Sequence, residues 1–125
     1  MSPAPNGSTA IIAGSTAATD PIFDVEYSEE KKDYKIPVTA PDINAYTFKY
    51  YKSAYRIDQT WSIRQNAARQ RHIDQSQSFN LYVKHDIKAS ELLNLHLTAW
   101  KLGLKTTYYV RSTTIDFEEC EWCAS

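Results

Sequence analysis

The clearest alternation of apolar and polar positions lies in the second half of the chain. Between residues 88 and 102, leucines and a tryptophan recur at helical spacing, and Gly103 follows where the pattern stops. Residues 76–83 and 106–113 are rich in β-branched and aromatic side chains, which predicts a strand on each side of this helix. A strand–helix–strand unit requires a parallel pair of strands joined by a right-handed crossover. We therefore predict an α/β fold.

The first half gives weaker patterns. Residues 58–73 predict a helix capped by Asp58 or Thr60, and residues 3–10 predict a loop that leads into a short helix capped by Asn6 or Ser8. Residues 20–45 are polar and contain three prolines, so we expect an irregular surface segment with a short strand near residues 34–38.

The small number of predicted strands bears on whether the fold is complete. Parallel strands are normally covered on both faces and paired at both edges. Two or three strands with one well-patterned covering helix do not meet these needs. We expect the missing strands to come from another polypeptide.

Composition excludes several classes of function. The chain has 125 residues, a mass of 14.3 kDa, a net charge of −1 and a pI near 6.3, which allows one domain at most and gives no basic surface for nucleic acid or an anionic membrane. No apolar run approaches the roughly 20 residues that span a bilayer, and the N-terminus lacks a signal-peptide pattern. We expect a cytoplasmic protein without nucleic-acid or membrane partners.

The N-terminal loop is a candidate anion site. Asn6, Gly7, Ser8 and Thr9 stand at a predicted helix start, where free backbone N–H groups and the helix dipole favour a phosphate. An ordinary capped turn explains the same residues, and neither a Walker lysine nor a G-x-G-x-x-G motif is present.

Two further motifs could carry redox chemistry. Tyr108 and Tyr109 are adjacent phenols, although strands are rich in tyrosine, and stacked rings at successive positions would need an irregular or strand-end backbone. Cys120 and Cys123 form a C-x-x-C pair, for which a reversible dithiol, an inert pair and a zinc site all remain open. The acidic residues around these cysteines disfavour thiolate.

Four runs in the observed order and spacing resemble one family, the large (alpha) subunit of class I ribonucleotide reductase, in forms most like those of T-even-type bacteriophages. They are the loop that ends at Ala10, the I-D-Q-S run that begins at Ile73, the G-L-K-T-T-Y-Y run that ends at Tyr109, and the terminal C-x-x-C. The resemblance covers essentially the whole chain and implies the C-terminal portion of a ten-stranded α/β barrel over residues 1–113. A mobile redox tail over residues 114–125 would follow it.

The resemblance also implies roles. Pro5, Asn6, Gly7, Ser8 and Thr9 match the loop that holds the substrate diphosphate. Tyr108 and Tyr109 match a stacked pair that passes an oxidising equivalent from the small subunit toward the active site. Cys120 and Cys123 match the tail dithiol that re-reduces the active-site disulfide.

The implied partners are a ribonucleoside diphosphate, thioredoxin or glutaredoxin, and the small subunit, which is expected to carry a di-iron/tyrosyl radical centre. No cofactor or metal is expected in this chain. The family's thiyl cysteine lies upstream of the loop and is not in this sequence, so we expect an N-terminal companion polypeptide of the large subunit to supply it, as in a split subunit. The alternative is a non-catalytic interaction module or fragment with a redox-sensitive or zinc-binding tail.

Overall fold

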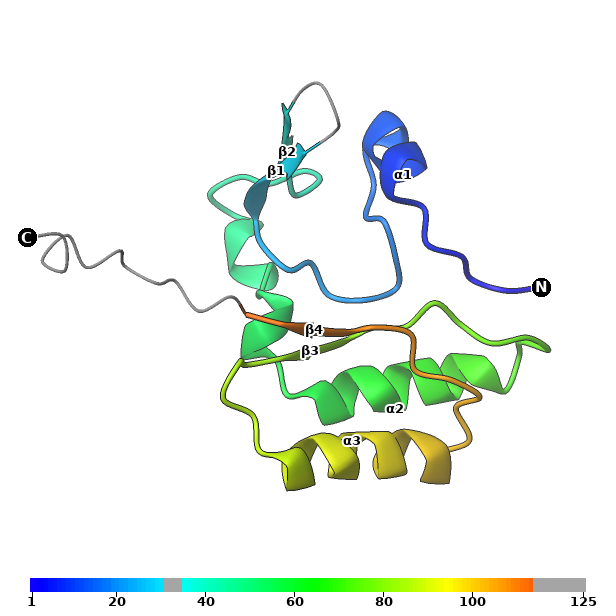
Figure 1. Cartoon of the computed structure of the whole chain (residues 1–125). Helices are drawn as coiled ribbons and strands as arrows, with labels where there is room; N and C mark the ends of the chain where they lie inside the picture. Colours follow the sequence, from blue (N-terminus) through cyan, green and yellow to red (C-terminus); the bar gives the residue numbers. More distant parts are fainter. Residues whose placement is uncertain (31–34, 114–125) are drawn as a thin grey trace, which may run out of the picture.

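The computed structural model describes residues 1–30 and 35–113 (Figure 1). Within these ranges the elements follow in the order α1 (Gly7–Ala13), β1 (Glu26–Glu30), β2 (Lys35–Thr39), the 3-10 helices η1 (Phe48–Tyr50) and η2 (Ala54–Arg56), α2 (Gln59–Gln70), β3 (Leu81–Val83), α3 (Ala89–Lys101) and β4 (Val110–Ser112).

The predicted strand–helix–strand unit is confirmed. Strands β3 and β4 pair in parallel, with Leu81 opposite Val110 and Val83 opposite Ser112, and α3 forms the connection between them. Helices α2 and α3 lie on one side of this pair, and α1 lies on the other side together with the β1–β2 hairpin (Figure 1). The molecule is therefore layered around β3 and β4.

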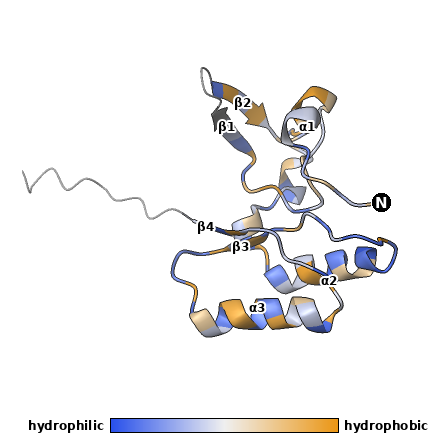
Figure 2. Ribbon diagram, turned by 45° about the vertical axis from the view of Figure 1, so that its right-hand side comes forward, coloured by the Kyte–Doolittle hydropathy of each residue, from blue (hydrophilic) through white to orange (hydrophobic). Residues whose placement is uncertain are grey.

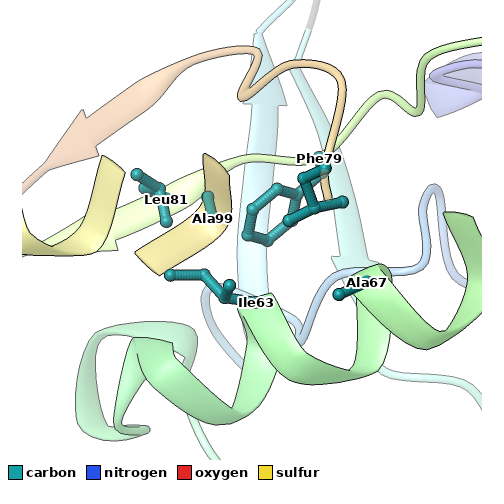
Figure 3. Packing of buried hydrophobic residues seen from close by; sticks show 6 residues of the cluster. Ile63, Ala67, Phe79, Leu81 and Ala99 are labelled. Carbon is teal, nitrogen blue, oxygen red and sulfur yellow. The ribbon is translucent and has the colours of Figure 1, made fainter. Parts of the chain in front are cut away.

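The hydrophobic core lies between the parallel strands and the two long helices. Phe79 and Leu81 on the strand side meet Ile63 and Ala67 of α2 and Ala99 of α3, and Leu104 completes the cluster (Figure 3). Phe79, Leu81 and Ile63 have no exposed surface. This core fixes the segment that leads into β3 against α2.

Helix α2 is held in place by polar contacts as well as by the core. The Asp58 carboxylate accepts the Thr60 N–H at 2.9 Å, which confirms Asp58 as the cap. Gln59 is buried, and its Oε1 accepts the Tyr82 N–H at 3.0 Å. An amide side chain of the helix thereby takes the place of a neighbouring strand for one backbone group of β3.

Helix α3 buries less of its apolar surface than its pattern predicts. Ala99 is buried, whereas Leu93, Leu97 and Trp100 are 57%, 40% and 73% exposed. Figure 2 shows hydrophobic residues along α3, on the outer side of the layered structure. Ala99 and the partly buried Leu95 are the side chains of α3 that pack against the core, and Leu93, Leu97 and Trp100 remain at the surface.

Two predictions for the strands need correction. The segments predicted as strands at 76–83 and 106–113 contain only the three-residue strands β3 and β4, because the backbone before each strand bonds outside the regular ladder. In segment 20–45 the short strand expected near residues 34–38 is confirmed as β2, but it pairs with β1, which was not predicted, in an antiparallel hairpin where Ser28 lies opposite Pro37. Proline is tolerated there because β2 has a free edge in this two-stranded sheet.

Candidate functional site

The tyrosine pair lies immediately before β4. The ring centroids of Tyr108 and Tyr109 are 4.1 Å apart with planes inclined by 53°, and both side chains are about half exposed. Neither residue belongs to the strand, so the structure has the strand-end backbone that a contact between neighbouring phenols requires. The structure thus brings these two candidate residues together.

The hydrogen bonds explain how two successive side chains meet. Continued from the Leu81–Val110 register, a regular parallel ladder would give the Phe79 carbonyl the N–H of Tyr109. Instead the Phe79 carbonyl accepts the Tyr108 N–H at 2.7 Å, while the Leu81 N–H donates to the Tyr109 carbonyl at 2.9 Å. One extra residue is thus accommodated at the tyrosines, which is a β-bulge. The bulge breaks the alternation that would send the two rings to opposite faces.

Asn80 and Asp20 adjoin this bulge, and sequence reasoning missed both as site residues. The Asn80 Oδ1 accepts the Tyr109 N–H at 3.3 Å, and its Nδ2 donates to the Asp20 carboxylate at 2.8 Å. The Asn80 backbone N–H donates to the same carboxylate oxygen at 3.2 Å. Asn80 is part of the run that carried the family resemblance, whereas no local signal links it to Asp20, 60 residues away.

Burial and two nearby arginines determine the electrostatic environment of Asp20, next to the tyrosine pair. Burial raises the pKa of Asp20, and its hydrogen bonds from Asn80 and the charges of Arg111 and Arg69 oppose this shift. The Arg111 guanidinium lies 5.8 Å from the centroid of the Tyr109 ring. Asp20 and Arg111 thus place a carboxylate and a guanidinium next to the tyrosine backbone and ring.

The two phenols also affect one another's titration. Hydrogen bonding to Tyr109 raises the pKa of Tyr108, and the charge of a Tyr109 phenolate would raise it further. The ring contact of 4.1 Å makes Tyr108 and Tyr109 neighbours, which is compatible with transfer of an electron and a proton between them.

The candidate anion loop lies at the start of α1. Gly7, Ser8 and Thr9 are the first three residues of this helix, and Pro5 to Thr9 are all exposed. Asn6 occupies the cap position but its side chain makes no capping bond, so the predicted side-chain cap is wrong. Its backbone conformation, with ψ at 48°, is outside the extended region from which capping side chains reach the helix N–H groups.

Two hollows adjoin this loop. Gly7 lines a cavity of about 480 Å³ together with Asp20 and Tyr82, and Asn6 and Thr9 line a second one of about 400 Å³. The loop therefore borders open space on two sides.

Contacts distant in sequence fix the N-terminal segment. The Ser78 N–H donates to the Pro3 carbonyl at 3.1 Å, and the Ser2 hydroxyl donates to the Ser76 carbonyl. At the other end, the Thr19 hydroxyl donates to Asn66 at 3.2 Å, next to the bonds of Asp20 with Asn80. Both ends of the first twenty residues are thus attached to the segment that leads into β3 or to α2.

The remaining candidate residues are the two cysteines of the C-x-x-C pair. Cys120 and Cys123 lie outside the described residues. Across residues 1–30 and 35–113, no group of three or more histidine, cysteine, aspartate or glutamate side chains could hold a metal ion. In the same ranges, no helix has the length and apolar character needed to cross a bilayer.

Comparison with known proteins supplies a family for this geometry. The family model described as "Ribonucleotide reductase, barrel domain" matches residues 28–110. The alpha subunit of ribonucleoside-diphosphate reductase from Treponema pallidum is 48% identical over 122 residues, which are 98% of this chain and 14% of that protein. The large subunit of the same reductase from Invertebrate iridescent virus 6 is 57% identical over 65 residues, covering 52% of this chain and 7% of that protein.

A solved structure agrees in fold. The alpha subunit of the class Id ribonucleotide reductase of Actinobacillus ureae superposes with a TM-score of 0.68 at 26% identity, over 89% of this chain and 26% of that one. The chain spans about a seventh of the length of the T. pallidum relative. It belongs to the ribonucleotide reductase family, as a part of the barrel domain of the large (alpha) subunit.

Proposed function

We propose that this chain forms part of a ribonucleoside-diphosphate reductase, in which Tyr108 and Tyr109 relay an oxidising equivalent toward the active site. The observation that carries this proposal is the ring contact of 4.1 Å at a backbone bulge, in a chain of the reductase barrel family. In each relay step a phenol loses one electron and one proton to its neighbour's phenoxyl radical, which becomes a phenol. The interaction with Tyr109 that raises the pKa of Tyr108 supports such an exchange.

The remainder of the barrel has to come from the rest of the large subunit. The described residues contain two parallel strands, and β4 is exposed along its whole length. A barrel closes only when each strand has a neighbour on both sides. The rest of the subunit would supply those strands and the thiyl cysteine, and the small radical-bearing subunit would supply the oxidising equivalent.

The substrate and the reductant are assigned from the family resemblance. Pro5 to Thr9 would hold the diphosphate of a ribonucleotide, supported by the exposed start of α1 and the hollows beside it. Cys120 and Cys123 would re-reduce the active site after each turnover and would in turn be reduced by thioredoxin or glutaredoxin. The radical centre of the small subunit, a di-iron/tyrosyl site in our proposal, would lie outside this chain.

The relay is tested in a reductase assembled from this chain, the rest of the large subunit and the small subunit. Tyr108→Phe and Tyr109→Phe each remove one phenol oxygen and should reduce deoxynucleotide formation to background while assembly is retained. Tyr46→Phe makes the same chemical change at a side chain that is 84% exposed and belongs to neither site, so it should leave turnover unchanged. Full turnover in either variant would refute the relay assignment, whereas a folded monomer without affinity for any reductase subunit would favour the non-catalytic interaction module.

The dithiol assignment needs a separate experiment. Cys120→Ser should stop turnover driven by thioredoxin or glutaredoxin but preserve turnover driven by a small dithiol that reaches the active site directly. Loss of both activities would contradict a shuttle role. Stoichiometric zinc in the purified chain, lost in the same variant, would favour a metal site.

A further inference from the structure

The bulge at the tyrosine pair leaves one backbone group without its ladder partner. The Phe79 carbonyl is occupied by the Tyr108 N–H at 2.7 Å, so the Tyr109 N–H cannot use it as a regular ladder would. A backbone donor without an acceptor carries a free-energy penalty, and the bulge is stable only if another acceptor is supplied. The Asn80 Oδ1 is that acceptor, at 3.3 Å.

Asp20 determines which end of the Asn80 amide faces the tyrosines. An ionised carboxylate only accepts hydrogen bonds, so the Asn80 Nδ2 must be the atom that faces Asp20, at 2.8 Å. The Oδ1 is then directed to the Tyr109 N–H. The reversed amide would set its oxygen against the carboxylate and its NH2 group against an N–H donor.

Three further features keep this arrangement in place. The Asn80 backbone N–H bonds to the same carboxylate oxygen at 3.2 Å, so Asp20 holds both the side chain and the main chain of Asn80. Asn80 is 8% exposed, which limits competition from water. Arg111, whose guanidinium lies over the Tyr109 ring, also contributes positive charge near Asp20.

We propose that Asp20 and Asn80 are positioning residues for the tyrosine relay, because together they satisfy the Tyr109 N–H that the bulge displaces and so keep the two phenols in contact. This inference rests on the proposed relay function. Without the Asn80 acceptor, the Tyr109 N–H has no partner in the bulge, and the bulge is destabilised. The contact between the two phenols is then no longer held, because in a regular ladder successive side chains point to opposite faces.

The first test measures the Tyr109 amide directly. In the assembled reductase, hydrogen–deuterium exchange with fragmentation that isolates this amide should be roughly tenfold faster in Asn80→Ala and in Asp20→Asn, as expected for loss of one buried hydrogen bond. Asp24→Asn is the matched control, since Asp24 is exposed and accepts only from the adjacent Val25 N–H in the described hydrogen bonds. Exchange equal to the parent in both test variants would overturn the proposal.

Exchanging the two side chains gives a rescue that a merely structural role would not predict. Asn80→Asp alone places two carboxylates together and should disrupt the site. In the double variant Asp20→Asn/Asn80→Asp, an amide again faces a carboxylate, one oxygen remains for the Tyr109 N–H, and slow exchange and turnover should both return. If the double variant is no better than either single one, the pairing is not the operative contact.

Turnover separates this inference from the relay itself. Asn80→Ala should lower kcat and leave the KM for the nucleoside diphosphate unchanged, because Asn80 lines neither of the two cavities beside the candidate anion loop. If Tyr108→Phe retains turnover, the relay is refuted, while the exchange data still test whether Asp20 and Asn80 position the Tyr109 N–H. If Tyr108→Phe is inactive and Asn80→Ala retains the parental kcat, the relay stands and the positioning role is refuted.

Discussion

Replacing Phe79 by alanine should remove the largest buried side chain of the core that supports the tyrosine segment. Phe79 has no exposed surface and packs against Ile63, Ala67 and Leu81 (Figure 3). Its neighbours Ala67 and Ala99 are too short to move into the vacated space, so the site cannot collapse well. We therefore expect a loss of about 4 kcal/mol, toward the upper part of the range for buried phenylalanines.

Urea denaturation of the chain, followed by tryptophan fluorescence, measures this loss. With a slope of about 2 kcal/mol per molar urea, the midpoint should fall by roughly 2 M. Phe48→Ala removes the same ring from a side chain that is 60% exposed and should change the free energy of unfolding by less than about 0.5 kcal/mol. Equal midpoint shifts for Phe79→Ala and Phe48→Ala would refute the assignment of Phe79 to the core.

Three further predictions concern local stability. Asp58→Ala should cost about 1 kcal/mol in urea denaturation because α2 loses its cap to the Thr60 N–H, and Asp58→Asn should restore most of that loss. Gly14→Ala should cost roughly 1 kcal/mol in the same assay although the space around it is open, because the residue has φ of 64° at the end of α1. Burial raises the pKa of Asp20 above its ordinary value of 3.8, so the folded chain binds this proton more tightly than the unfolded chain does. The free energy of unfolding should therefore lose a contribution as pH rises from 3.8 through the raised pKa, and thermal denaturation across that window should show a smaller loss in Asp20→Asn.

Local pattern was sufficient to predict the parallel unit. The leucines between residues 88 and 102 mark α3, and the runs on either side of it contain β3 and β4. The same pattern did not predict which face of α3 is buried, because Ala99 and Leu95 make the contact with the core, whereas Leu93 and Leu97 do not. Apolar periodicity identifies a helix, but the choice between faces depends on the shape of what it packs against.

The strand expected near residues 34–38 is β2, whereas β1 and the hairpin pairing were missed because these strands carry residues that local propensity assigns to surface loops. Glu26 and Pro37 are both uncommon in strands, yet β1 and β2 pair over five residues each. In a two-stranded ribbon both strands are edges, so charge and proline are tolerated.

The contact between Tyr108 and Tyr109 could be anticipated only as a condition on the backbone. Sequence reasoning required a strand-end or irregular conformation, but the bulge that meets this requirement depends on Phe79, Asn80 and Asp20. Asp20 comes from a distant part of the chain, and no local pattern predicts its contact with Asn80. Local sequence patterns do not predict contacts between segments that are far apart in the sequence.

The attachment of the first twenty residues has a consequence for biosynthesis on the ribosome. Ser2 bonds to Ser76 across 74 residues, and Asp20 bonds to Asn80 across 60. At translation rates of about 5–20 residues per second, the nascent segment waits roughly 4 to 15 seconds before the acceptor for Ser2 has even been synthesised. Throughout that delay the candidate anion loop lacks the partner that holds Ser2, so a chaperone or protease would meet it as an unanchored segment.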